Sequence, residues 1–125
     1  MNPQAIEKYI NGICSKLNEM INKEQISPIY KTILQDAPEV IETQAKASLK
    51  MQEDRTGLNL IVAVLYSQKF LDYMKKLDQA YSSCSPEDKI KVSQCQLAPF
   101  QISLLAKQLV LAPGIIKQYE AIAKQ

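Results

Sequence analysis

The chain has 125 residues, of which 46% are hydrophobic and 22% are charged, with a formal net charge of +2. This composition predicts one soluble globular domain, 1–125, that needs neither metal ions nor disulfides to bury a core. Arg55 is the only arginine, which argues against a nucleic-acid partner, and the absence of histidine removes the commonest general base and zinc ligand. We therefore predict no enzymatic activity, no cofactor and no metal site.

The first helix is predicted from Pro3 to about Lys23. Asn2 has the character of an N-cap residue, and proline is common at the first helical position after it. Apolar residues then recur at the 3.6-residue spacing of one helix face. They are Ile6, Tyr9, Ile10, Ile13, Leu17, Met20 and Ile21.

The second and third helices are each introduced by a predicted capping residue. Ser27 precedes Pro28, and the short helix that follows is expected to end near Gln35. Asp36 and Glu39 have the spacing of a capping box at the start of the third helix.

The third helix has only a thin apolar stripe, formed by Val40, Ile41, Ala45 and Leu49. We expect it either to lie on the surface or to approach a neighbour closely through its alanines. Gly57 interrupts the pattern and predicts a break there, with a single kinked helix from Pro38 to Tyr81 as the alternative.

The fourth predicted helix contains the longest apolar run of the chain. Asn59 is the only clearly polar residue in Leu58–Tyr66, so this run is expected to be the central, most buried element. It is far shorter than the roughly 20 residues that span a bilayer, and we expect no membrane insertion. Further along, one face is predicted to point inward; it is formed by Phe70, Leu71, Met74, Leu77 and Tyr81.

The C-terminal third predicts two or three more helices. Ser85, Pro86 and Asp88 form another cap, and the fifth helix should carry Ile90, Val92 and Leu97 and end before Pro99. The sixth helix should break at Pro113 and Gly114, before a terminal helix with Ile115, Ile116, Tyr119 and Ile122. The predicted fold is all-α, an irregular single-domain bundle of five to seven helices.

The sixth helix is apolar on two sides. Phe100, Leu104 and Leu111 share one side, whereas the opposite side carries Ile102, Leu105, Ala106 and Leu109. The commoner arrangement would place this helix between two layers of its own chain. In the alternative, one stripe contacts another protein, because exposed Phe and Leu otherwise favour aggregation.

The three cysteines, Cys14, Cys84 and Cys95, form no metal-binding or redox motif. Cys14 is expected to pack as a small apolar residue. Because the chain begins without a signal peptide, we expect a cytoplasmic protein with reduced thiols. A periplasmic or secreted origin is the alternative if Met1 replaces a removed signal, and a disulfide would support it.

These features favour a non-enzymatic protein-binding module, a small helical regulator, adaptor or inhibitor. Its partner would be another protein or a second copy of the chain. Phe100, Leu104 and Leu111 would be buried against that partner, with Lys107 at the rim. Two alternatives are a secreted or periplasmic toxin-neutralising or inhibitor protein with a disulfide, and a carrier of a small apolar ligand between helices. The carrier's pocket would be lined by Leu60, Val64 and Leu105.

Overall fold

The computed structural model describes residues 3–123, except the side chains of residues 3 and 115–120. The helices are α1 (Pro3–Lys23), α2 (Pro28–Leu34), α3 (Ala37–Glu53), α4 (Gly57–Ser82), α5 (Pro86–Gln94) and α6 (Pro99–Ala123). No strand occurs within the described range. The predicted all-α helical bundle is therefore confirmed. The predicted N-cap Asn2 and the side chains of Ile115, Ile116 and Tyr119 lie outside the described residues.

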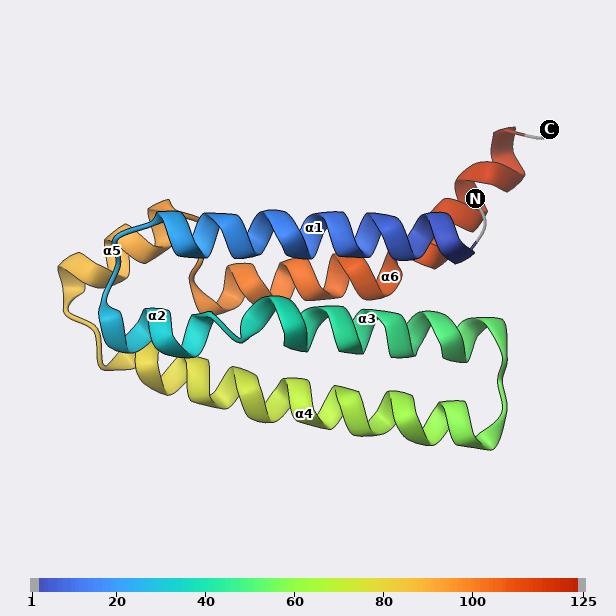
Figure 1. Cartoon of the computed structure of the whole chain (residues 1–125), viewed down its shortest axis with the longest axis horizontal. Helices are drawn as coiled ribbons and strands as arrows, with labels where there is room; N and C mark the ends of the chain where they lie inside the picture. Colours follow the sequence, from blue (N-terminus) through green and yellow to red (C-terminus); the bar gives the residue numbers. More distant parts are fainter. Residues whose placement is uncertain (1–2, 124–125) are drawn as a thin grey trace.

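Helix α3 occupies the middle of the bundle. It lies between α1 and α4 in Figure 1, and it also packs against α6. Helix α4 forms one edge and is additionally contacted by α2. The buried core draws on every helix and on the segment that joins α5 to α6.

The central position of α3 follows from its small residues. Ala45 is 1% exposed, and Ala47 and Ser48 are also buried, so the backbones of neighbouring helices can approach closely on several sides. The side-chain oxygen Oε1 of Gln44 is also buried, and it has no hydrogen-bond partner among the described residues. The expectation of close packing through alanines is confirmed, and the alternative surface position is wrong.

The prediction that Leu58–Tyr66 is the most buried element is wrong. Five apolar side chains of this run are between 53% and 71% exposed: Leu58, Leu60, Ile61, Val64 and Leu65. Leu71, predicted to point inward, is 55% exposed, whereas Phe70 and Leu77 are buried as expected. The reason is geometrical, because α4 lies at the edge of the bundle and only one of its faces meets α3 and α2.

The predicted break before α4 is confirmed, and the single kinked helix is excluded. Helix α3 ends at Glu53 and α4 begins at Gly57. The hydroxyl of Thr56 accepts a hydrogen bond from the Asn59 backbone N–H at 3.3 Å, which caps α4. The Asn59 side chain in turn donates to the Asp54 carbonyl at 2.8 Å and fixes the turn.

The predicted capping residues behave differently from one another. Ser85 accepts a hydrogen bond from the Asp88 backbone N–H at 3.2 Å, as the sequence predicts. Ser27 and Asp36 precede their helices as expected, but neither side chain makes a capping hydrogen bond. Asp36 has helical backbone angles, so α2 and α3 follow each other too tightly for an extended N-cap residue.

Helix α5 is shorter than predicted because the chain adopts a left-handed conformation at Gln96, whose φ is 63°. The Gln96 N–H donates to the Ser93 carbonyl and the Leu97 N–H donates to the Val92 carbonyl, both at 3.1 Å. This is the Schellman arrangement that ends many helices. Leu97, predicted as part of the helix, instead follows it as a fully buried residue, and Ile90 is exposed.

The predicted break at Pro113 and Gly114 is wrong, because α6 continues through Pro113 to Ala123. Proline has no N–H to donate, and its ring crowds the preceding turn, which bends a helix without necessarily ending it. Figure 1 shows the C-terminal part of α6 leaving the direction of its first part.

Candidate protein interface

The two stripes predicted on α6 meet different surroundings. Ile102, Ala106 and Leu109 are at most 2% exposed and pack in the core. Phe100, Leu104 and Leu111, on the opposite side, are 62%, 52% and 60% exposed. Lys107 lies among them and is also exposed. The expectation that the helix is covered on both sides by its own chain is therefore wrong. We refer to Phe100, Leu104, Lys107 and Leu111 as the α6 stripe.

A groove of about 410 Å³ runs beside the α6 stripe, between α6 and α1. Leu104 and Leu105 line it from α6, and Ile13, Leu17 and Met20 line it from α1. Polar side chains line it as well, from Lys16, Gln96, Gln101 and Gln108. A lining that combines apolar and polar side chains is the composition of a protein-binding groove.

The α1 side of this groove is not evident from the sequence. Met20 belongs to the apolar stripe predicted to point inward, but it is 41% exposed. Tyr9, on the same predicted stripe, is 50% exposed. Which apolar residues of α1 are covered depends on where α6 packs against it. Helical periodicity in the sequence does not predict that position.

Gln101 fixes the end of the groove at the start of α6 through hydrogen bonds. Its side-chain carbonyl accepts a hydrogen bond from the Ala98 backbone N–H at 2.9 Å, which is one half of a capping box at the start of α6. Its amide donates to the Ser93 carbonyl and to the Gln96 side-chain oxygen, both at 3.1 Å. The first turn of α6, which carries Phe100, is therefore fixed to the end of α5.

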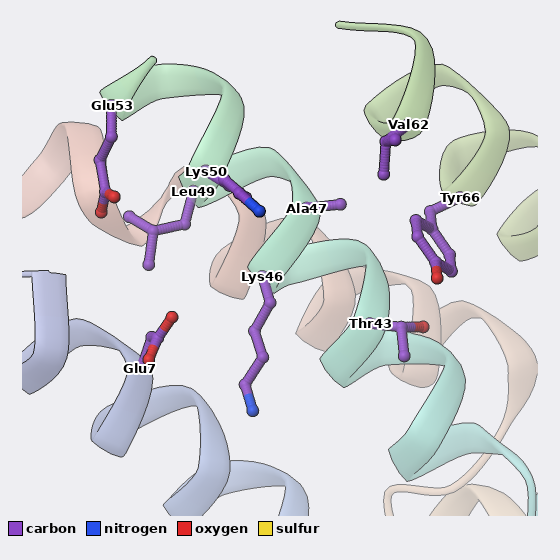
Figure 2. A pocket seen from close by; sticks show the side chains of 9 residues that line it. All are labelled: Glu7, Thr43, Lys46, Ala47, Leu49, Lys50, Glu53, Val62 and Tyr66. Atoms are coloured by element: carbon purple, nitrogen blue, oxygen red, sulfur yellow. The ribbon is translucent and has the colours of Figure 1, made fainter. Parts of the chain in front are cut away.

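A second pocket, of about 450 Å³, opens over α3 (Figure 2). Lys46 and Lys50 extend from α3 into it, with Glu7 on the α1 side and Val62 and Tyr66 on α4. Lys46 forms an ion pair with Glu42, one turn earlier on α3, at 3.2 Å. The lining carries both signs of charge on solvated side chains, so it does not select an anionic or a cationic ligand. Among the described residues, no group of three acidic or cysteine side chains could hold a metal ion.

The residues predicted to line a carrier pocket do not come together. Leu60 and Val64 are exposed on α4, whereas Leu105 lines the groove between α1 and α6. Neither of the two cavities described above is lined by all three.

All three cysteines are free thiols. Cys14 is buried, as predicted, and burial raises the pKa of its thiol from 9.0 to about 11. Burial also raises the pKa of the Cys95 thiol. Neither thiol is activated as a nucleophile, because nucleophilic cysteines have lowered pKa values.

Comparison with protein-family models, with curated proteins and with solved structures finds no match for this chain. One stretch of the described residues, Pro86–Gly114, is long and apolar enough to cross a membrane by length and composition. This is weak evidence for a span, because the core helix of a bundle passes the same test. The stretch also contains the left-handed turn at Gln96, which separates α5 from α6.

Proposed function

We propose that this protein is a non-enzymatic protein-binding module, a helical regulator, adaptor or inhibitor that acts through the α6 stripe. The observation that carries the proposal is the exposure of Phe100, Leu104 and Leu111, each at least 52% exposed, on a helix whose opposite face is in the core. Exposing a Phe and two Leu side chains in one stripe costs solubility, and a partner that covers them removes this cost.

The geometry favours a partner that presents an apolar helix or loop. Leu104 belongs both to the α6 stripe and to the groove beside it, so a partner seated on the stripe would also contact Met20 and Ile13. The apolar side chains of the groove would supply affinity, and Lys107 with Gln108 would orient the partner. The rigid anchoring of the first turn of α6 by Gln101 would reduce the entropy lost on binding.

The test is the affinity for a partner isolated from the protein's own host, compared between wild type and Phe100→Ala. Truncating a central aromatic anchor is expected to cost about 2 kcal/mol, which raises the Kd roughly 30-fold. Ile29→Ala is the matched control, because Ile29 is 70% exposed on α2, outside the stripe. An unchanged Kd for Phe100→Ala, with the helical circular-dichroism spectrum intact, would exclude the stripe as the binding surface.

A further inference from the structure

Helix α4 carries a second exposed apolar surface, which the α6 stripe does not include. It consists of Leu58, Leu60, Ile61, Val64, Leu65 and Leu71, and we refer to it as the α4 face. Each of these residues is between 53% and 71% exposed. They lie on the side of α4 opposite the buried residues Ala63, Phe70 and Leu77. We propose that the α4 face is the interface of a homodimer, in which two α4 helices pack antiparallel around a two-fold axis.

The exposed area fits a dimer. The α4 face exposes on the order of 600 Å² of apolar residue surface, so two copies together would bury roughly 1,200 Å², the lower limit of a standard interface. Single exposed apolar residues are ordinary, but six on one side of a helix between Leu58 and Leu71 form a surface at the upper end of what monomers expose.

The α4 face is complementary to itself when the helices run antiparallel. With the two-fold axis between Val64 and Leu65, these two residues lie opposite each other across the axis. Leu58 then lies level with Leu71 of the second copy, and Ile61 lies level with Gln68. Leu60 lies level with Lys69, at the border of the contact. A two-fold interface needs this self-complementarity, which an unrelated partner would not require.

The centre of the α4 face is free of charged residues. No Asp, Glu, Lys or Arg occurs from Gly57 to Gln68, so the centre of the interface contains no buried charge. In a parallel pair, the exposed Lys75 of one copy would lie level with Lys75 of the other, and that contact would be repulsive.

The polar side chains at the border already have partners within the chain. The Gln68 amide donates to the Asp72 carboxylate at 3.1 Å, and the Lys69 ammonium lies 5.1 Å from the centre of the Tyr66 ring, on the flank of α4. When a second copy covers the α4 face, Lys69 therefore stays at the border of the interface and is not buried at the centre of the interface.

The first experiment measures the mass of the reduced protein by light scattering behind a sizing column, at about 100 µM, where an interface of this size is expected to be occupied. Wild type is expected to have twice the mass of one chain, and Leu65→Glu the mass of a single chain. Leu104→Glu is the matched control on the α6 stripe, with similar exposure, and should remain dimeric. A monomeric wild type, or a dimer lost in Leu104→Glu but kept in Leu65→Glu, would overturn the proposal.

A milder variant covers the case in which Leu65→Glu fails to fold, as judged by circular dichroism. Leu65→Ala keeps an apolar side chain and is expected to raise the dimer Kd about tenfold. An unchanged Kd would contradict a central position for Leu65.

The antiparallel register has its own test. In chains whose partly exposed Cys84 and Cys95 are replaced by serine, a mixture of Leu58→Cys and Leu71→Cys is expected to form a disulfide-linked dimer on mild oxidation, whereas neither variant alone should. Crosslinking of Leu58→Cys with itself would indicate a parallel pair and overturn the register. Cosedimentation with phosphatidylcholine vesicles tests whether the α4 face binds lipid instead. A monomeric protein that sediments with the vesicles would overturn the homodimer and assign the α4 face to a lipid surface.

Discussion

At the scale of single residues, Cys14 shows what burial does to a side chain that the sequence leaves undetermined. It lies on α1 beside the apolar stripe and is 4% exposed. Burial, with a smaller contribution from the negative charge of Glu42, raises the pKa of its thiol from 9.0 to about 11. Its role is therefore to fill the core.

This pKa predicts how stability depends on pH. In the unfolded chain the Cys14 thiol loses its proton near pH 9.0, whereas the folded chain holds it until about pH 11. Between these values the unfolded state binds fewer protons, so the free energy of unfolding must fall as pH rises. Below pH 9.0 the Cys14 thiol is protonated in both the folded and the unfolded chain, so it does not make the free energy of unfolding depend on pH.

The check is urea unfolding at a series of pH values, for wild type and for Cys14→Ala. The variant is expected to lose less stability between pH 9 and pH 11, whatever its stability at neutral pH. Comparing slopes cancels the other groups that titrate in this range, including Cys95, whose pKa burial also raises. Equal slopes would mean that Cys14 is accessible to solvent.

The candidate interface was partly predictable at the residue scale. The two-sided pattern of α6 separates Phe100, Leu104 and Leu111 from Ile102, Ala106 and Leu109, and the structure places these sets in solvent and core, respectively. Ile13 and Met20, which complete the groove, could not be predicted. Helical spacing identifies residues on one face, but it does not say how much of that face a neighbouring helix covers.

At the scale of helices, capping sequences predicted where helices begin better than how they are capped. Helices α2, α3 and α5 each begin directly after the residue that the sequence marks, Ser27, Asp36 or Ser85. Only Ser85 makes the capping hydrogen bond. The others sit in short connections, where the backbone angles are imposed by the packing of the flanking helices.

This difference predicts unequal effects of two similar substitutions. Ser85→Ala removes the acceptor for the Asp88 N–H and is expected to lower the free energy of unfolding by about 1 kcal/mol. Ser27→Ala removes no capping bond and should change stability by less than about 0.5 kcal/mol. Urea unfolding of both variants provides the measurement, and equal losses would contradict the assignment of the caps.

At the scale of the whole molecule, the positions of α3 and α4 are the reverse of those expected from hydrophobicity. The more polar α3 is central, and the more apolar α4 lies at the edge (Figure 1). Small residues let α3 pack against α1, α4 and α6 together, whereas the large side chains of the α4 face remain uncovered. A single chain of this arrangement leaves two apolar surfaces, the α6 stripe and the α4 face, available for contacts.

The central position of α3 predicts that it does not tolerate larger side chains. Ala45→Leu is expected to lower the free energy of unfolding by about 1–3 kcal/mol, because the added atoms force the neighbouring helices apart. Ala121→Leu, at an exposed position of α6, should change it by less than about 0.5 kcal/mol. Thermal or urea unfolding of both variants tests this. A neutral Ala45→Leu would mean that α3 is not packed closely on that face.

The sequence by itself determined the all-α class, most helix starts, the break before Gly57 and the two-sided character of α6, because spacing and capping chemistry are local properties. Only the tertiary structure decided that α3 is central, that Leu58–Tyr66 faces outward and that α6 continues through Pro113. These depend on how closely helices approach one another, which is set by side-chain volumes at contacts between residues far apart in the chain. Apolar composition measures the tendency of a segment to be buried, but the number of neighbours available to bury it is a property of the assembled bundle.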